Sequence, residues 1–493
     1  MRKLLSGLGL ALILVACGFS QKPQEYPEGV SIPRFLTKQE RAWIDLHPLV
    51  VPDITSPPSG PIKCLSEFDP MSGILVAWEG STAQNNIIAS MSPFITGVNG
   101  NAKLIVVVDT VSEQTSASST LQSAGANMSR VEFIVTTTDT IWIRDYGPRY
   151  VYVGGCRTII DHTYNRPRPN DDNFPFVFAA AKQQQIHSIP LIHGGGNFQL
   201  DSANRGYATR LIANENTGLT ESQIINHWLN YQSLTTTLLN PFPTTVDSTQ
   251  HLDMWMQMAS NNRVIISDWP NNVGSTQDNI CDAAALSMAT LGYTVYRVPA
   301  FSISGVHYTY TNSVICNNVV MVPTYTNTTV SPSNSTALAV FGVAFPGKQI
   351  VGIPSQNIIA SAGAIHCITI QVPTNKNGEY PGTYLVSPNT GGSFTSGQVV
   401  SIDWLADDDN AVSKVDLYLE IEDSLLESAS ALPLLGGFTP RRWIPIAANL
   451  SNSMLFSWTV PNLKATRARI VVVATDAQGR YAWDKSDATF SIQ

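Results

Sequence analysis

The sequence predicts an α/β domain built as a five-bladed, pseudo-symmetric propeller and followed by an all-β sandwich. Strand-like apolar runs alternate with helix-like stretches up to about residue 376, and helix signals disappear after about residue 383. Before residue 376 the chain returns to polar segments at intervals of 52 to 59 residues, at Asp145, Asp201, Asp253, Asn312 and Cys367. Five repeats arranged radially would bring these polar segments to one central place.

The α/β domain is expected over residues 62–376. Its strands are predicted from apolar or β-rich runs, at 73–78, 103–109, 130–136, 151–161 (a hairpin), 188–193, 207–213, 263–268, 294–298 and 349–353, with one more ending at 322. Near-continuous apolar strands of this kind are typical of buried sheets. Helices are predicted at 85–94, 112–124, 177–185, 220–231, 281–291 and 336–344. Thr220 and Gln223 form a capping-box pattern at the start of one of them.

The all-β domain is expected over residues 383–493, with strands at 393–404, 412–420, 442–447, 454–460, 467–476 and 488–492. Short strands separated by Gly, Asn, Asp and Pro turns favour a β-sandwich. The stretch SPNTGGSFTSGQVVSIDW resembles the immunoglobulin-like modules of secreted bacterial enzymes. The acidic triplet 407–409 is expected to be a solvated turn, since no calcium-ligand spacing surrounds it.

Length and composition indicate the number of domains and argue against one class of binding partner. The chain has 493 residues, 43% hydrophobic and 13% charged, with a formal net charge of −8. This length favours two domains. Scattered Lys and Arg and a negative net charge argue against nucleic-acid binding.

The N-terminus predicts export and lipidation. Arg2 and Lys3 precede an apolar run at 8–16 that is too short to span a bilayer as a mature helix. The run ends in LVAC, which resembles a bacterial lipobox with lipid added at Cys17. We therefore expect a signal peptide at 1–16, a Pro-rich tether at 17–61 and a lipid-anchored protein of the cell envelope.

Four cysteines remain besides Cys17 and Cys367, namely Cys64, Cys156, Cys281 and Cys316. Outside the cytoplasm they allow up to two disulfides in three possible pairings, although Cys316 is expected simply to be buried. No cysteine spacing suits a metal, and no metal site is predicted.

Cys367 is the candidate nucleophile. It follows the small residues 361–364, which allow a tight turn and the close approach of a ligand. The other returns supply two carboxylates, Asp145 and Asp253, which suit the edges of a planar guanidinium. Trp142 would cover the face of that cation. A cysteine peptidase is the alternative, but it needs only one carboxylate to orient its histidine.

The chemistry expected of this set is hydrolysis of a guanidinium. The Cys367 thiolate would attack the central carbon, ammonia would leave, and water would hydrolyse the thiouronium intermediate. His251 would protonate the ammonia and then deprotonate the water. No organic cofactor is needed.

Four blocks, WIRDYGP, GGGNFQLD, HLDMW and IHCITIQVP, resemble the signature blocks of the agmatine deiminase and bacterial peptidylarginine deiminase family. The resemblance implies the five-bladed pentein fold, with Cys367 as nucleophile and His251 as acid and base. It implies Asp145 and Asp253 as guanidinium clamps, and it places Trp142 and Asn312 in the substrate site. The sequence Ser-Ala-Gly at 361–363 departs from the glycine run that agmatine deiminases usually carry.

The stretch YNRPRPNDD at 164–172 is similar to the bacterial peptidylarginine deiminase. In an extended, proline-stiffened segment Arg166 and Arg168 would project to one side and bind the carboxylate of a peptide that ends in arginine. A structural pair that bonds to nearby aspartates or loop carbonyls is the other interpretation. Asp201 would hold the substrate backbone or one of these arginines. His366 is assigned no role, because neighbours on an extended segment point to opposite sides.

The expected function is therefore deimination of peptidyl or C-terminal arginine to citrulline and ammonia. One alternative is an agmatine deiminase that forms N-carbamoylputrescine for putrescine biosynthesis. Another is a surface-binding or adhesion lipoprotein with a vestigial catalytic domain. The oligomeric state and the ligand of the sandwich stay open.

Overall fold

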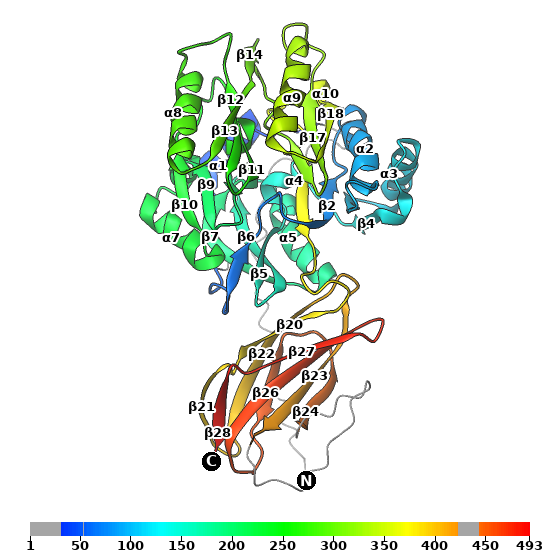
Figure 1. The fold of residues 1–493 in the computed structure, drawn as a ribbon, viewed down its shortest axis with the longest axis vertical. Helices are drawn as coiled ribbons and strands as arrows, with labels where there is room; N and C mark the ends of the chain where they lie inside the picture. The colour runs from blue at the N-terminus through cyan, green and yellow to red at the C-terminus, as the bar shows by residue number, and fades with distance from the viewer. Residues whose placement is uncertain (1–30, 53, 423–442) are drawn as a thin grey trace, which may run out of the picture.

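A computed structural model describes residues 31–52, 54–422 and 443–493, which form a mixed α/β part and an all-β part stacked along the long axis (Figure 1). The predicted signal peptide and Cys17 lie outside the described residues. Within the described ranges, no helix combines the length and the apolar character needed to cross a membrane.

The α/β part repeats one unit, in which an antiparallel strand pair is followed by a helix and a third strand parallel to the second. Three sheets follow the unit without addition: β8-β9-β10, β11-β12-β13 and β16-β17-β18. Their strands are Gln199–Leu200, Arg205–Thr209 and Thr235–Leu239; Met256–Ser260, Arg263–Asp268 and Thr294–Pro299; and Val314–Cys316, Val319–Thr324 and Gln349–Pro354. The helices between the parallel strands are α7 (Glu221–Gln232), α8 (Thr276–Thr290) and α9 (Asn334–Ala344).

The other two sheets extend the unit by one strand each. Strands β5 (Arg149–Val153), β6 (Cys156–Tyr164) and β7 (Gln185–His193), with α5 (Pro169–Lys182), are joined at the edge by β1 (Ile62–Cys64). The last sheet has the order β19-β2-β3-β4, from Ile370–Pro373, Met71–Ala77, Lys103–Val108 and Val131–Val135. It contains α2 (Thr82–Thr96) and α3 (Val111–Ser123) in its connections. A small hairpin, β14 (Phe301–Ile303) and β15 (Val306–Tyr308), stands apart.

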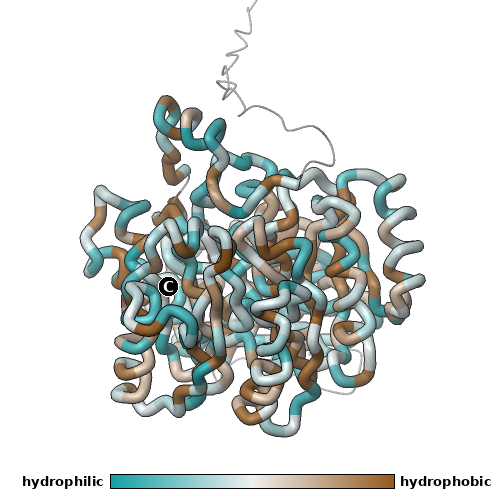
Figure 2. Tube along the Cα trace, turned by 90° about the horizontal axis from the view of Figure 1, so that it is seen from above, coloured by the Kyte–Doolittle hydropathy of each residue, from teal (hydrophilic) through white to brown (hydrophobic). Residues whose placement is uncertain are grey.

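The last sheet joins the two ends of the α/β part, because the late strand β19 pairs antiparallel with the early strand β2. Helices α3, α7 and α8 lie at the periphery (Figure 1). Seen from above, hydrophobic and hydrophilic stretches alternate along the chain, as expected for elements with one buried side (Figure 2). The mixed α/β fold is confirmed. None of the sheets in the described ranges closes on itself, and the five-bladed propeller stays a prediction.

Some element boundaries differ from the predictions. Helix α5 begins at Pro169 rather than near residue 177, because proline suits the first turn of a helix, where its missing N–H costs nothing. The run 207–213 is divided between β9 and the short helix α6 (Leu211–Glu215). The capping box of Thr220 and Gln223 at α7 is confirmed.

The all-β part consists of two sheets that share one hydrophobic core. One sheet has the order β20-β22-β25 (Gly382–Ser387, Val399–Asp407, Leu455–Thr459). The other has the order β21-β28-β26-β23-β24, with β27 beside β26 (Thr390–Phe394, Ala488–Ile492, Ala465–Asp476, Val412–Ile421, Trp443–Leu450, Tyr481–Lys485). The single strand predicted at 393–404 is therefore wrong, since β21 and β22 belong to different sheets. The immunoglobulin-like topology stays a prediction.

The acidic triplet joins the two parts, so the expectation of a solvated turn is wrong. The Asp407 carboxylate accepts bonds from Nε, Nη2 and the backbone N–H of Arg157 in β6, at 2.8, 3.1 and 3.1 Å. Nη1 of Arg157 lies 2.6 Å from the half-exposed Asp409 carboxylate. Burial alone would lower the pKa of Arg157, but the two carboxylates outweigh it and hold that pKa above its ordinary value.

All five cysteines in the described ranges are free and buried. All five lie in hydrophobic clusters, Cys64 and Cys156 in one, Cys316 and Cys367 in a second and Cys281 in a third. None of the disulfide pairings left open by the sequence is formed.

The tether prediction is wrong for residues 31–46. Residues Lys38–Leu46 form α1, which begins with a capping box between Thr37 and Glu40. Ile32, Arg34 and Glu40 are buried against the α/β part, and the Arg34 side chain is fully inaccessible. This N-terminal segment, residues 31–46, enters the candidate active site.

Candidate active site

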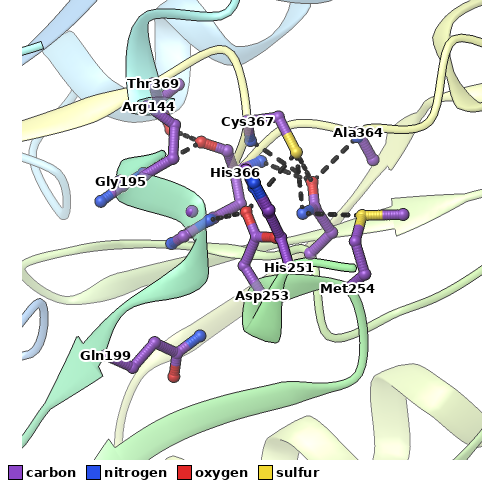
Figure 3. Close-up of polar contacts among 12 residues, drawn as sticks. Arg144, Gly195, Gln199, His251, Asp253, Met254, Ala364, His366, Cys367 and Thr369 are labelled. Carbon is purple, nitrogen blue, oxygen red and sulfur yellow. Dashed lines mark hydrogen bonds and ion pairs between the residues drawn. The ribbon is translucent and has the colours of Figure 1, made fainter. Parts of the chain in front are cut away.

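Four of the five repeats place a polar side chain just before the first strand of their sheet. Asp145 lies in α4 (Ile143–Tyr146) before β5, and Asp253 lies in a 3-10 turn (Leu252–Met254) before β11. Asn312 precedes β16, and Cys367 lies in the turn before β19. The structure brings these side chains and His251 together in a buried site, where Figure 3 shows Cys367, His251 and Asp253 facing one another.

The repeat of β8 differs because it contributes glycine in the equivalent position. Gly196 precedes β8, and its N–H donates to Oδ1 of Asp145 at 3.1 Å. A Cβ atom at Gly196 would lie 1.8 Å from Nη2 of Arg34, so only glycine leaves room for the group held there. Asp201, the expected second polar return, comes after β8 and is out of phase with the other repeats.

Asn312 holds both the turn and the thiol of Cys367. Its Oδ1 accepts the N–H groups of Ala364 and His366 at 2.9 and 3.1 Å, and its Nδ2 lies 3.0 Å from Sγ of Cys367. The backbone N–H of Arg144 donates to the Cys367 carbonyl at 3.1 Å, which ties this turn to α4. The amide therefore presents a donor to the sulfur, which stabilises a thiolate.

The clamp carboxylates, Asp145 and Asp253, grip a guanidinium that belongs to the protein itself. Nε and Nη2 of Arg34 each donate to Asp145 at 2.8 Å. Nη1 and Nη2 of Arg34 each donate to Asp253 at 3.1 Å. Both contacts are bidentate, the geometry in which a guanidinium binds carboxylates most strongly.

His251 lies at one nitrogen of this guanidinium. Its Nδ1 is 2.6 Å from Nη2 of Arg34 and 3.4 Å from Oδ1 of Asp145. Nη2 is thus the nitrogen with both carboxylates and an imidazole beside it. The position suits a proton transfer to or from a group at Nη2.

The backbone of the N-terminal segment is bound as well. The Trp142 indole N–H donates to the Ile32 carbonyl at 2.8 Å, and Nε of Arg166 donates to the Arg34 carbonyl at 3.0 Å. The Arg34 N–H donates to the Ser361 carbonyl at 3.0 Å. Trp142 therefore contacts the peptide backbone, and no cation–π contact between Trp142 and Arg34 occurs among the described residues.

Arg168 binds a carboxylate, but one that belongs to the same polypeptide. Its Nε donates to Oε1 of the buried Glu40 at 2.8 Å, and its Nη2 donates to the Pro33 carbonyl at 2.7 Å. Arg166 and Arg168 are both buried, and both contact the N-terminal segment. The alternative of a structural pair is met for carbonyls, since Arg166 donates to the Asn165 and Arg34 carbonyls and Arg168 donates to the Pro33 carbonyl. It is not met for Asp171 and Asp172, which accept from Thr140 and from the N–H of Tyr164.

Asp201 does not reach the site, which corrects its assignment to the substrate backbone or to the Arg166 and Arg168 pair. Its carboxylate accepts from Nε of Arg205 at 2.7 Å and from the hydroxyl of Tyr293. It also accepts the N–H groups of Ala203 and Arg205, so Asp201 stabilises the turn into β9.

His366 lies in the site, and the expectation that it points away from the side of Cys367 is wrong. Residues 365–368 form a turn, so neighbouring side chains do not alternate as on a strand. Nδ1 of His366 is 2.8 Å from Oδ2 of Asp253, and Nε2 is 2.9 Å from Oε2 of Glu67. Glu67 in turn accepts from Nη1 of Arg144 at 2.9 Å. No pattern in the sequence singles out Arg34 or Glu67.

The clamp carboxylates are ionised in this arrangement. Burial alone would raise the pKa of Asp145, but Arg34 and His251 hold that pKa well below its ordinary value. Burial also opposes ionisation of Asp253, yet Arg34, His366 and His251 lower its pKa to about 2. The same balance, with Arg144 and His366 against burial, lowers the pKa of Glu67 to about 2.

The nucleophile candidate rests as a thiol beside a neutral imidazole. Burial, together with Asp253 and Asp145, raises the pKa of Cys367 well above its ordinary value, although Arg34 lowers it. Burial and the Arg34 cation lower the pKa of His251, although Asp145 raises it. A bound cation is thus the group at this site that favours the thiolate.

The arrangement can therefore hold a guanidinium by its edges, with a histidine at the leaving nitrogen and a thiol in the same buried space.

Comparison with known proteins agrees with this geometry. The family model described as Porphyromonas-type peptidyl-arginine deiminase matches residues 63–373, more than half of the chain. Putative agmatine deiminases of Marinomonas sp. (strain MWYL1) and Shewanella baltica (strain OS195) are 38% and 37% identical over 64 and 67 residues. The matched stretches span only 16% and 17% of those relatives and 13% and 14% of this chain.

Solved structures share the fold at low identity. A substrate-bound agmatine deiminase of C. jejuni matches with a TM-score of 0.55 and 17% identity, over 64% of this chain and 97% of that chain. A putative arginine deiminase from Porphyromonas gingivalis matches with a TM-score of 0.55 and 18% identity, over 64% and 99%. An agmatine deiminase of Enterococcus faecalis matches with a TM-score of 0.56 and 18% identity, over 64% and 96%.

Proposed function

Because the chain belongs to the Porphyromonas-type peptidyl-arginine deiminase family, and is thus a hydrolase of amidine C–N bonds, we propose that it deiminates peptidyl arginine to citrulline. The observation that carries this proposal is the binding of Arg34. The clamp carboxylates hold its side chain, while Arg166 and Ser361 bind its backbone carbonyl and N–H. Agmatine has neither of these backbone groups, so these two contacts favour a peptide.

The first chemical step is attack on the guanidinium carbon. Neutral His251 takes the thiol proton as the bound cation lowers the pKa of Cys367, and Sγ forms a bond to the carbon. Nδ1 of His251 then gives the proton to the nitrogen at the Nη2 position, and the C–N bond breaks. Ammonia leaves, and a positively charged thiouronium remains between Asp145 and Asp253, which stabilise its charge.

The second step hydrolyses the thiouronium intermediate and regenerates the free enzyme. Water enters at the vacated Nη2 position, where Nδ1 of His251 accepts its proton as the oxygen attacks the carbon. The C–S bond breaks and the ureido group forms, His251 gives its proton back to the departing Cys367 sulfur, and the second proton of the water goes to the released ammonia. One guanidinium and one water are consumed for each ureido group and ammonium formed, so atoms and charge balance.

A peptide that ends in arginine is the favoured substrate within this class. In place of the Arg34 carbonyl it would offer Arg166 a carboxylate, and a charged acceptor makes a stronger bond than a neutral one. When the N-terminal segment leaves, Glu40 leaves with it and Arg168 becomes available to the same carboxylate.

The test compares kcat/KM for ammonia release from three substrates: a peptide ending in arginine, a peptide with internal arginine, and agmatine. We expect the peptides to be preferred, and Arg166→Ala to lower peptide turnover about 10- to 100-fold without lowering agmatine turnover. Arg41→Ala is the matched control, since Arg41 is exposed on α1. A preference for agmatine, or unchanged peptide turnover in Arg166→Ala, would overturn the peptidyl assignment.

The rival from another class, a binding lipoprotein with a vestigial catalytic domain, predicts no ammonia from any guanidine. Cys367, His251, Asp145 and Asp253 are all present and lie together around one guanidinium, which argues against a catalytic domain that has lost its activity.

We further propose that the five sheets are the blades of a five-bladed propeller and that lipid at Cys17 anchors the protein in the cell envelope. Metabolic labelling with a fatty acid, compared between wild type and Cys17→Ala, tests the anchor.

A further inference from the structure

The N-terminal segment lies across the active site in the manner of a substrate peptide. Over residues 32–34, three carbonyls and one N–H are bound, by Trp142, Arg168, Arg166 and Ser361, at 2.7 to 3.0 Å. The segment has no strand pairing among the described residues, so these bonds are made with site residues and the loop before Cys367 rather than with a sheet. Single bonds spaced along an extended peptide are what a peptide-binding site supplies.

Arg34 completes the likeness to a substrate. Its guanidinium fills the carboxylate clamp, its Nη2 lies 2.6 Å from Nδ1 of His251, and its charge acts directly on the Cys367 thiol. An arginine that only stabilised the folded structure would need the ion pairs with the carboxylates. It would not need the His251 imidazole beside the nitrogen that leaves in the reaction. We propose that Arg34 is a self-modification site, deiminated in cis by Cys367, and that its conversion to citrulline opens the active site; this rests on the proposed function.

The reaction is that proposed for an external substrate. Sγ of Cys367 bonds to Cζ of Arg34, the bond from Cζ to Nη2 breaks, and ammonia leaves with a proton from His251. Water then adds at Cζ, its proton goes to His251, and the C–S bond breaks. Arg34 becomes citrulline, and the only co-reactant is water.

The product binds the site less well for a specific reason. The new oxygen takes the place of Nη2, which lies 2.8 Å from Oδ1 of Asp145 and 3.1 Å from Oδ2 of Asp253. Nη2 donates to both carboxylates, whereas the new oxygen can only accept. It therefore faces two carboxylate oxygens without a hydrogen between them. The clamp also loses the cation that holds its carboxylates ionised in a buried site, and leaving a buried charge without its partner is strongly unfavourable. The N-terminal segment is therefore released after one turnover.

Mass spectrometry of the full-length protein tests the modification. We expect the mass gain of deimination at Arg34 in wild type and not in Cys367→Ala. Trypsin provides a second readout, because it no longer cleaves after residue 34 once the guanidinium is lost. Arg41, exposed on α1 seven residues later, should stay arginine in both proteins and serves as the internal control.

The intramolecular route has its own test. Refolded wild-type protein should modify Arg34 with a first-order rate that does not change on tenfold dilution. Active enzyme added to the Cys367→Ala protein should leave its Arg34 unmodified while that segment is docked. A rate proportional to concentration would overturn modification in cis.

The opening of the site is measured with an external peptide. Freshly prepared wild type should show a lag that ends as Arg34 is converted, and Arg34→Gln should show none. The initial rate of wild type should be at least about tenfold lower than that of Arg34→Gln, since a site occupied nine-tenths of the time leaves one-tenth free. Arg41→Gln should keep the lag of wild type. Equal initial rates with no lag would overturn the gating role.

The outcomes separate this inference from the proposed function. Turnover of external peptides together with an unmodified Arg34 overturns the self-modification and leaves the function standing. No ammonia from any guanidine, in wild type or in Arg34→Gln, overturns both.

Discussion

Nδ2 of Asn312 lies 3.0 Å from Sγ of Cys367, while Oδ1 of the same amide accepts the backbone N–H groups of the turn that carries the thiol. One amide thus fixes both the position of the sulfur and the donor that stabilises its anion. The two residues are 55 positions apart and belong to successive repeats.

Asn312→Asp should lower kcat/KM for peptide by roughly 30-fold. The substitution keeps an acceptor for the turn but replaces the donor with a negative oxygen, and a hydrogen bond to a charged group contributes about 2 kcal/mol. The pKa of Cys367 should rise further, which the pH dependence of its alkylation by iodoacetamide measures, with mass spectrometry to identify the labelled cysteine. A Cys367 pKa unchanged in Asn312→Asp would contradict the role of Nδ2 as donor to the sulfur.

His366 is a positioning residue for the clamp. In His366→Ala, Asp253 loses the donor at 2.8 Å, and the pKa of Asp253 should rise because His366 is one of the groups that lower it. We expect KM for peptide to rise about tenfold, with a smaller effect on kcat, and the acid limb of kcat/KM to move to higher pH. His366→Asn, whose amide can replace Nδ1, should restore most of the loss. A fall in kcat alone would argue that His366 takes part in the chemistry.

The contact between the two parts of the molecule predicts a stability effect. Asp407→Asn leaves Arg157 buried without its main carboxylate and should cost about 3 kcal/mol, the loss typical of breaking a buried ion pair. Asp409→Asn removes the same charge from a half-exposed partner of the same arginine and should cost less than about 1 kcal/mol. Urea unfolding of both variants checks this. Equal effects would mean that the buried bonds of Asp407 contribute nothing beyond its charge.

The sequence was sufficient for residues that belong to the repeats. Cys367, His251, Asp253 and Asp145 each stand in a block whose position before a strand recurs, so their convergence follows from the period. The same reasoning failed for Asp201, because a spacing alone cannot distinguish the residue before the short strand β8 from one just after it. Gly196 occupies the equivalent position. Because glycine has no side chain, the sequence shows no polar residue there.

Arg34 could not be predicted from the sequence, because its hydrogen bonds within the described part of the chain join it to residues more than 100 positions away. The sequence around Arg34 is Pro-rich and polar, which is typical of a tether. Arg34 is buried because the N-terminal segment binds in the active site, and no amphipathic pattern in the sequence indicates this.

His366 was missed for a different reason. The β-type run after Cys367 suggested an extended backbone, but the turn at 365–368 directs His366 to Asp253.

Glu40 should control how tightly the N-terminal segment is docked. It is 2% exposed, and its carboxylate is the partner of Arg168. Glu40→Gln leaves the buried Arg168 without a counter-charge and should weaken docking by about 3 kcal/mol. The N-terminal segment should then become sensitive to protease, which limited proteolysis of a Cys367→Ala background measures. Asp45→Asn, an exposed carboxylate on the same helix, should leave the protease resistance unchanged. Protection that survives in Glu40→Gln would show that the ion pair does not hold the segment.

The contribution of Arg34 to stability should depend on pH in a defined window. The pKa of Asp253 is about 2 in the folded protein, against an ordinary aspartate value of about 3.9. A depressed folded pKa gives stability that is complete above the ordinary value and is lost as the pH falls through the folded one, here about 2 to 3 kcal/mol in all. Arg34 supplies part of this, together with His366 and His251. In a Cys367→Ala background, which keeps Arg34 as arginine, Arg34→Gln should be less stable than its parent at pH 6. The difference in free energy of unfolding should shrink steadily between pH 4 and pH 2.5. Arg41→Gln should show no such trend, and a difference for Arg34→Gln that stays constant with pH would mean that Arg34 stabilises the fold by packing rather than by its charge.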